Sequence, residues 1–231
     1  MAVRTELTAL VSSTSREVRH RLAEALQRRG WRVFVGSPGG KNGGPEEGSS
    51  IALDTSSDRS VAAAASFVAR HTDHQDQLVF QSGDTAESGV DPITGRQSFE
   101  EIRGAYDRDA IGLLRTVNGF LGLVDHGRMK RLCFLSAVDA SINGCTEDRS
   151  FAFLMCKAAA NMAVAILLNR LRPEGYTFRL YAPESTPESP VAAERAVDYF
   201  LRNRSLGAGD PRRADEDRLV LRVWMGREHP W

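Results

Sequence analysis

The residues of this sequence that could do chemistry include a lysine set in an apolar stretch. Residues 150–171 (SFAFLMCKAAANMAVAILLNRL) form its longest nearly uninterrupted helical pattern, and Lys157 is the one lysine within it. A helix that is apolar on almost every face must be buried on almost every face. An ammonium group there needs a partner, a task, or a path by which its long side chain reaches water. Phe153, four residues earlier, lies on the same helix face as Lys157.

The composition limits the class of protein and its partners. Lys+Arg and Asp+Glu both number 30, so the charge favours neither nucleic acid nor an anionic membrane as a partner. The three cysteines, Cys133, Cys145 and Cys156, form no CxxC pair. They indicate reduced thiols, without a disulfide framework or a zinc site. The N-terminus lacks a signal-peptide pattern, and the apolar run at 158–168 is too short to span a bilayer. We expect a soluble cytoplasmic protein.

Strand and helix patterns alternate along the whole chain. The sequence predicts strands at 7–11, 31–35, 51–53, 77–80, 131–135, 177–181 and 218–225, and helices at 16–29, 58–71, 99–125, 150–171 and 191–203. This order predicts an α/β fold, with a doubly wound, mostly parallel sheet between two helical layers. Residues 1–231 are expected to form one domain, and the Gly- and Pro-rich residues 36–50 a mobile surface loop.

In such a sheet, ligands bind beyond the carboxyl ends of the strands. The first strand-to-helix turn, ALVSSTSREVRHRLAEAL at 9–26, resembles the ALVTGASxGIGxxxAxxL pattern of the short-chain dehydrogenase/reductase family. The resemblance covers nearly the whole chain, and it implies a Rossmann-like fold and an NAD(P)-dependent oxidoreductase.

The glycines of that first turn are replaced in this chain. Ser15 is kept, but Ser13, Glu17 and Arg19 stand where the family has glycine. Glycine allows the tight turn, the close approach of backbone amides to a pyrophosphate and close helix–strand packing. A carboxylate such as that of Glu17 also competes with phosphate for the positive end of the helix dipole. Dinucleotide binding in the usual manner is therefore not expected, and residues 13–19 fit the plain start of a helix equally well.

Three further positions match the family's cofactor-binding residues. Asp54 ends a strand where the family has an Asp near the adenine, although Asp is also a common turn residue. Gly83 is the last residue of LVFQSG, which stands in place of LVNNAG. Pro183 keeps the proline of the family's PG turn, with Glu184 replacing the glycine. Lys157 also contacts the cofactor in the family.

The family's catalytic residues are altered in the same way. Its Tyr-x-x-x-Lys pair reads Phe153 and Lys157 here. In that pair the ammonium lowers the pKa of the phenol, which then transfers a proton to or from the substrate oxygen. The family's Asn is Asp109, and its catalytic Ser position is Ala137, with Ser136 adjacent and within a one-residue shift of alignment. Phe153 has no proton to give, so the resemblance implies loss of ordinary carbonyl reduction.

Other candidates rest on single residues. His71 and His74 could form a metal pair, but a helix-end role fits better, and we expect no metal site. Cys156, beside Lys157, reads as a small buried residue or as a reactive thiol. Tyr181 ends a strand and could serve as an acid from another direction.

The leading hypothesis is a protein of this fold that has lost standard catalysis and acts as a ligand-binding or partner subunit. The first alternative is an NAD(P)H-dependent reductase of a small carbonyl or alcohol, with Tyr181, Asp109 or Ser136 in altered roles. The second is a lyase or isomerase that uses Lys157 and Asp109 without nicotinamide. The resemblance also implies a homo-oligomer, a dimer or tetramer, formed through residues 99–125 and 150–171.

Overall fold

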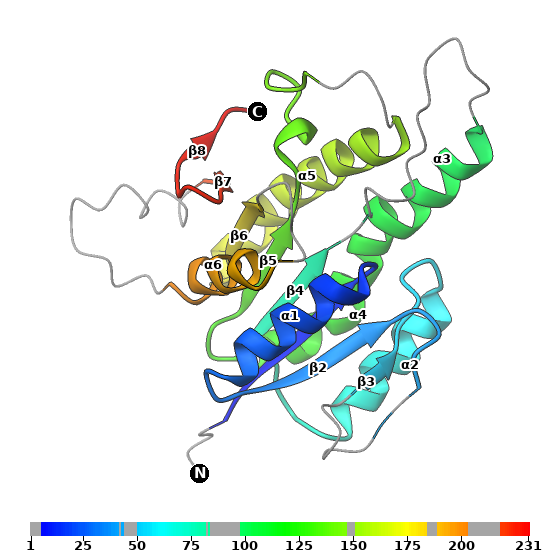
Figure 1. Cartoon of the computed structure of the whole chain (residues 1–231). Coiled ribbons are helices and arrows are strands. Elements are labelled where there is room, and N and C mark those ends of the chain that lie inside the picture. Colours follow the sequence, from blue (N-terminus) through cyan, green and yellow to red (C-terminus); the bar gives the residue numbers. More distant parts are fainter. Residues whose placement is uncertain are drawn as a thin grey trace.

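A computed structural model of the chain describes residues 6–41, 43, 50–81, 83, 98–146, 151–183, 189–202 and 218–231. Its strands form one eight-stranded sheet in the order β3-β2-β1-β4-β5-β6-β7-β8. The strands are β1 (Leu7–Ser13), β2 (Trp31–Ser37), β3 (Ser50–Ala52), β4 (Gln77–Gln81), β5 (Arg131–Leu135), β6 (Thr177–Ala182), β7 (Leu221–Val223) and β8 (Glu228–His229). Every pair is parallel except β7 with β8. The predicted doubly wound α/β fold is confirmed (Figure 1).

Helices cover both faces of the sheet. They are α1 (Arg16–Gln27), α2 (Asp58–Ala69), α3 (Phe99–Tyr106), α4 (Gly112–Asp125), α5 (Phe151–Leu171) and α6 (Pro190–Leu201). One core places α1 and α6 against the sheet, and a second core places α2, α4 and α5 against its other face (Figure 1). The strands alternate between the two cores, as in β1, where Ala9 and Val11 belong to the first and Leu10 to the second.

The structure corrects several predicted boundaries. β2 continues to Ser37, so the loop predicted at 36–50 begins two residues later than expected. Residues 42 and 44–49 of that loop lie outside the described part of the chain. The predicted helix at 99–125 is interrupted by a π-helical turn, Asp107–Ile111. The predicted strand at 218–225 is only Leu221–Val223, because the chain turns at Gly226 (φ 78°) and returns as β8. Asn203, the predicted end of the last helix, is not among the described residues.

The α5 helix is a core helix of this fold. With the turn after it, it is the one helical segment among the described residues that is long and apolar enough to cross a membrane. Its Val164, Leu168 and Leu171 are buried in the core beside the sheet. Such a helix passes a length and hydropathy test because it is apolar on nearly all sides.

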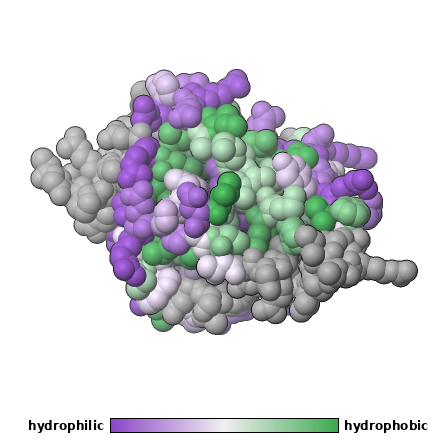
Figure 2. Space-filling view, turned by 90° about the horizontal axis from the view of Figure 1, so that it is seen from above, coloured by the Kyte–Doolittle hydropathy of each residue, from purple (hydrophilic) through white to green (hydrophobic). Residues whose placement is uncertain are grey.

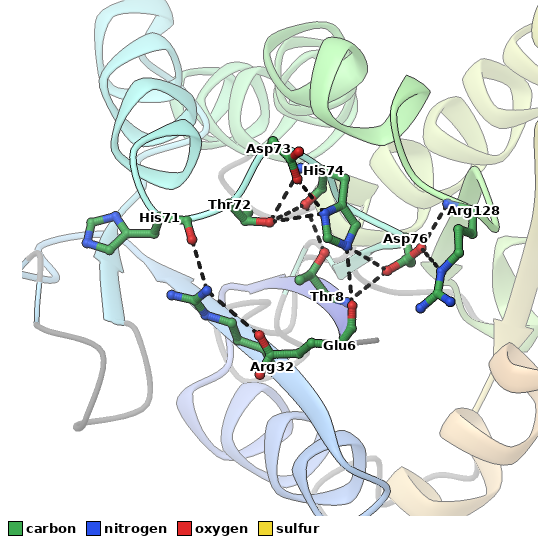
Figure 3. A network of polar contacts seen from close by, with 9 residues as sticks. All are labelled: Glu6, Thr8, Arg32, His71, Thr72, Asp73, His74, Asp76 and Arg128. Carbon is green, nitrogen blue, oxygen red and sulfur yellow. Dashed lines mark hydrogen bonds and ion pairs between the residues drawn. The ribbon is translucent and has the colours of Figure 1, made fainter. Parts of the chain in front are cut away.

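A buried carboxylate ties together the amino edge of the sheet. Asp76 has no solvent exposure; its Oδ2 accepts from the backbone N–H of Thr8 (2.9 Å), and its Oδ1 accepts from that of Arg128 (2.8 Å) (Figure 3). The His74 ring lies beside it, with Nε2 3.5 Å from Oδ2 of Asp76 and Nδ1 2.8 Å from the exposed carboxylate of Asp73. The start of β1, the start of β4 and the turn before β5 are thus joined through one side chain.

Candidate active site and cofactor turn

Lys157 and Phe153 share one face of α5, as their spacing predicts. Lys157 is 3% exposed, and its Nζ donates a hydrogen bond to the backbone carbonyl of Leu135 (3.2 Å) at the end of β5. The same Nζ lies 5.5 Å from the centroid of the Phe153 ring. A cation over an aromatic face is attracted by the ring quadrupole. The ammonium is therefore held by a carbonyl dipole and a π-face.

Two further family positions converge on the Phe153 ring. A Cβ placed on Gly83 would lie 3.1 Å from Cδ2 of Phe153 and 3.3 Å from Oδ2 of Asp109. Gly83 also has a φ of +68°, which favours glycine. Phe153, Asp109, Gly83 and Lys157 thus lie close together in the structure.

Asp109 is only 3% exposed, and it lies in the π-helical turn between α3 and α4. Burial, with the Asp109 charge as a second cause, raises the pKa of the neighbouring Cys156 thiol to about 11. Cys156 is itself 1% exposed. Its thiol is protonated at neutral pH, which supports a packing role and argues against a reactive thiolate.

Ser136 is hydrogen-bonded to Asn161, a residue that was not predicted from the sequence to belong to the site. Its Oγ donates to Oδ1 of Asn161 (2.7 Å), and both side chains are buried. Asn161 lies one helical turn after Lys157, on the face that also carries Phe153. A polar residue at that spacing in an otherwise apolar helix was the available signal.

The β1–α1 turn, where the family holds its cofactor, is bridged by side chains. The Ser13 hydroxyl contacts Oε1 of Gln81 and the carbonyl oxygen of Ser15 (3.0 Å). Gln81 also donates from Nε2 to the carbonyl of Gly83 (3.0 Å), so β1 and β4 are joined across the site. The Arg19 guanidinium donates to the Ser13 carbonyl.

The side chains at the start of α1 serve the helix itself. Ser15 is its N-cap, accepting at Oγ from the N–H of Val18 (3.4 Å). Glu17 pairs with Arg21 (2.8 Å) on the same helix. Partial burial, and then the nearby Arg16 charge, lower the pKa of Arg19. Glu17 and Arg19 thus lie in the first turns of α1, whereas Ser13 is the last residue of β1.

Two positions that match the family's cofactor-binding residues remain, Asp54 and Pro183. Oδ1 of Asp54 accepts from the N–H (2.9 Å) and the hydroxyl (2.6 Å) of Ser56, which is the turn role considered from the sequence. Pro183 directly follows β6 and is half-buried, whereas Glu184 lies outside the described residues.

Comparison with known proteins identifies the fold of this chain. No family model matches the sequence. A protein called C-signal from Myxococcus xanthus is 29% identical over 121 residues, which are 50% of this chain and 73% of that protein. The carbonyl reductase Sniffer of D. melanogaster superposes with a TM-score of 0.78, over 98% of this chain and all 100% of that one, at 15% identity. The chain has the short-chain dehydrogenase/reductase fold.

Two other structures of this fold carry cofactor. An oxidoreductase of the short-chain dehydrogenase/reductase family from Brucella ovis, in complex with a partially ordered NAD, gives a TM-score of 0.70 at 17% identity, covering 88% of this chain and 97% of its own. The NADPH-bound carbonyl reductase from chicken fatty liver gives 0.73 at 14% identity, covering 98% of this chain and 100% of its own. The dinucleotides belong to those proteins, and for this chain the likeness establishes the fold.

Within the short-chain dehydrogenase/reductase fold, Tyr181 lies on the wrong face for the role considered from the sequence. Its ring packs against Tyr199 (5.8 Å between centroids) and Phe200 (6.2 Å), in the core under α1 and α6. Lys157 approaches from α5, on the other face of the sheet. The possible role of Tyr181 as an acid at this site is therefore not supported, because alternate residues of a strand point to opposite faces of the sheet and Tyr181 points away from Lys157.

The histidines near residue 71 have structural roles in this fold. The His71 ring lies at the end of α2, with Nδ1 2.8 Å from the carbonyl oxygen of Phe67. That contact is the helix-end role expected from the sequence. Within the described ranges, no group of three His, Cys, Asp or Glu side chains lies close enough to hold a metal ion.

Proposed function

We propose that this protein has lost the standard reaction of its fold and acts by binding, as a ligand-binding or partner subunit. The observation that carries the proposal is the Phe153 ring, which packs against Lys157 and Gly83 in the place of a proton-donating phenol. A hydrocarbon ring can neither give nor take the proton that carbonyl reduction requires.

Three side chains that could replace the missing phenol are poorly suited to that role. The Ser136 hydroxyl donates a hydrogen bond to Oδ1 of Asn161, and both side chains are buried. Cys156 is buried, with its pKa raised to about 11, so it is a poor acid near neutral pH. Tyr181 belongs to the core on the other face of the sheet. These observations support loss of catalysis over a rearranged catalytic set.

A nicotinamide dinucleotide does not fit the β1–α1 turn in the manner usual for the fold. That manner needs backbone amides open to a pyrophosphate. Here the Arg19 guanidinium donates a hydrogen bond to the Ser13 carbonyl, and the Ser13 hydroxyl donates one to Oε1 of Gln81. Both contacts lie in the β1–α1 turn. Glu17 adds negative charge at the helix N-terminus.

The relative from Myxococcus xanthus gives independent support. Its name, C-signal, describes a signal. A binding role for this chain agrees with that name. We also infer that the chain is a cytoplasmic protein, because its three cysteines form no CxxC pair and do not suggest a disulfide framework.

A titration with NADH and with NADPH tests the proposal. We expect no saturable change in heat or nicotinamide fluorescence up to millimolar cofactor, because the turn is occupied by the protein's own groups. Saturable binding in the micromolar range would refute the closed-turn argument. The Arg19→Gly, Glu17→Gly double variant is the matched control: if these side chains are the obstacle, it should gain affinity.

A reductase with an altered site is the second candidate, and one observation favours it. Lys157, Gly83 and Asp109 still converge on residue 153, so the frame around the missing phenol is kept. If cofactor binds, Phe153→Tyr should raise carbonyl-reducing activity by about 10²–10⁴-fold, the usual contribution of a general acid. No gain in a cofactor-binding variant would count against this candidate.

We further propose that the chain forms a homodimer, or a tetramer, through residues 99–125 and 150–171. Several large apolar side chains on these helices are exposed: Phe99, Tyr106, Ile111, Leu114, Met155, Met162 and Ile166. Figure 2, seen from above, shows hydrophobic side chains gathered in the middle of the surface with hydrophilic ones around them. Unpartnered apolar surface of this kind favours burial against a second chain.

Light scattering after size exclusion tests this dimer. The wild-type protein should elute as a dimer at micromolar concentration, and Met162→Glu should shift it to the monomer by placing a charge in the interface. Val191→Glu on α6 is the control, since Val191 is similarly exposed (56%, against 63% for Met162) but lies on the helix layer of the other face. A monomeric wild-type protein would remove the proposal.

A further inference from the structure

One helical turn beside the candidate site is wider than its neighbours. The π-helical turn Asp107–Ile111 joins α3 to α4, and the N–H of Gly112 donates to the carbonyl of Asp107, five residues back. An α-helix makes this bond four residues back, so the π-helical turn holds more residues than an α-helical turn. Single turns of this kind are rare, and side chains that insert into the hydrogen-bond ladder are a known cause of such irregularity.

Two side chains donate hydrogen bonds to the carbonyls of this turn. The Thr55 hydroxyl, from the loop after β3, donates to the carbonyl of Arg108 (2.9 Å). The Arg115 guanidinium, from α4, donates from Nη1 to the carbonyl of Asp107 (3.1 Å) and from Nη2 to Oδ1 of the same residue (2.8 Å). A carbonyl without a donor costs free energy when it is shielded from water, so these bonds favour the widened form of the turn.

The loop after β3 lies directly against the turn. A Cβ placed on Gly112 would lie 2.9 Å from Cβ of Thr55 and 3.0 Å from its carbonyl oxygen. That carbonyl also accepts from Nη1 of Arg115 (3.3 Å). Thr55 is 9% exposed and the Arg115 side chain 21%, so water competes little for these bonds. Glycine at position 112 allows the approach on which the Thr55 bond depends.

The residue at the centre of the turn is Asp109, which belongs to the candidate site. Its Oδ2 lies 3.3 Å from the position of a Cβ on Gly83, and the Phe153 ring lies 3.1 Å from the same position. The carboxylate is thus placed between the end of β4 and α5, on a backbone turn that Thr55 and Arg115 hold from the other side.

We propose that Thr55 and Arg115 are positioning residues for the candidate site. By donating to two carbonyls of the π-helical turn they hold it in its widened form, and this form keeps the Asp109 carboxylate beside Phe153. The arrangement requires neither a cofactor nor a catalytic cycle. It therefore stands apart from the proposed function and applies equally to an altered reductase.

The thiol of Cys156 reports the place of the Asp109 carboxylate. Burial raises the pKa of this thiol to about 11, and the Asp109 charge is the second cause. The charges of Arg108 and Lys157 act in the opposite direction and are smaller effects. Moving the carboxylate away should therefore let the thiol ionise at a lower pH.

The Thr55→Val, Arg115→Met double variant tests the proposal. Without the two donors the turn should open more often, so amide exchange at Gly112 should become about 2–10-fold faster. The Cys156 thiol should ionise at a lower pH than in the wild type, as followed by ¹³C NMR of the labelled cysteine during a pH titration. An unchanged thiol titration would overturn the proposal, whatever the exchange rate.

A cycle with Asp109→Asn separates positioning from general loosening of the fold. If Thr55 and Arg115 act through Asp109, the double variant should not lower the ionisation pH of Cys156 further in the Asp109→Asn background. A further fall there would mean that burial of the thiol has changed, and would overturn the proposal.

Two conservative variants complete the test. Asp58→Asn removes the exposed partner of Arg115 Nε (2.8 Å) but neither donor to the turn, so it should titrate like the wild type. Thr55→Ser keeps the hydroxyl and should retain the wild-type behaviour that Thr55→Val loses. If the double variant does not fold, this single pair decides the question, and equal titrations of the two would overturn the role of Thr55.

Discussion

Gly127→Ala should lower the free energy of unfolding by about 3–5 kcal/mol and Tm by about 10 °C. Gly127 is buried in the turn between α4 and β5. A Cβ there would lie 2.0 Å from the carbonyl oxygen of Gln75 and 3.0 Å from Cα of Asp76. Both are backbone atoms, so no flexible side chain can move aside.

The steric clash would occur where the segment between α4 and β5 is hydrogen-bonded to the residues just before β4. The N–H of Gln75 donates to the carbonyl of Leu123 (2.8 Å), and that of Arg131 donates to the carbonyl of Asp76 (3.1 Å). Making room for a methyl group would stretch both hydrogen bonds.

Urea unfolding measures the effect, with Gly122→Ala as the matched control. Gly122 is exposed on α4, and nothing lies within 4 Å of its would-be Cβ. Alanine there should stabilise the protein by about 0.5–1 kcal/mol, because it favours the helix. Equal effects in the two variants would contradict the close approach at Gly127.

Asp76→Ala should cost about 2–4 kcal/mol of stability, the second large effect. The change removes the acceptor of two backbone N–H groups, those of Thr8 and Arg128, and leaves the first of them buried. The methyl group of alanine cannot accept either hydrogen bond. Amide hydrogen exchange at Thr8 should also become faster, because its bond closes the start of β1 against β4.

Asp73→Ala is the control for this network. Its carboxylate contacts the same histidine, His74, at 2.8 Å, but the side chain is 69% exposed. Exposed ion pairs contribute about 0–1 kcal/mol, so this variant should unfold almost like the wild type. A loss as large as that of Asp76→Ala would mean that His74, and not the two N–H groups, carries the stabilisation.

Local pattern was enough to predict most of the fold. Short apolar runs marked the strands because a parallel strand is buried on both faces. The pairing of Phe153 with Lys157 followed from helix geometry alone. The π-helical turn Asp107–Ile111 escaped prediction, because the apolar pattern runs through it without a break.

Contacts between distant residues set the features that sequence could not predict. Arg131 and Arg179 are each 3% exposed inside strands, where an arginine is rarely buried. Both donate to the carbonyl of Arg202 after α6, and Arg131 also to that of Phe200. The contact of Ser13 with Gln81, which bridges the cofactor turn, spans 68 residues. No local pattern encodes such pairs.

The two outer strands bear on how the protein behaves when concentrated. β3 has three residues and β8 has two, and β8 folds back antiparallel on β7. Strands this short offer few unpaired backbone groups to another chain. Growth of fibres by edge-to-edge addition is thereby disfavoured at both ends of the sheet. Any self-association would then use the helical surfaces, where contacts are made by side chains and can be changed one residue at a time.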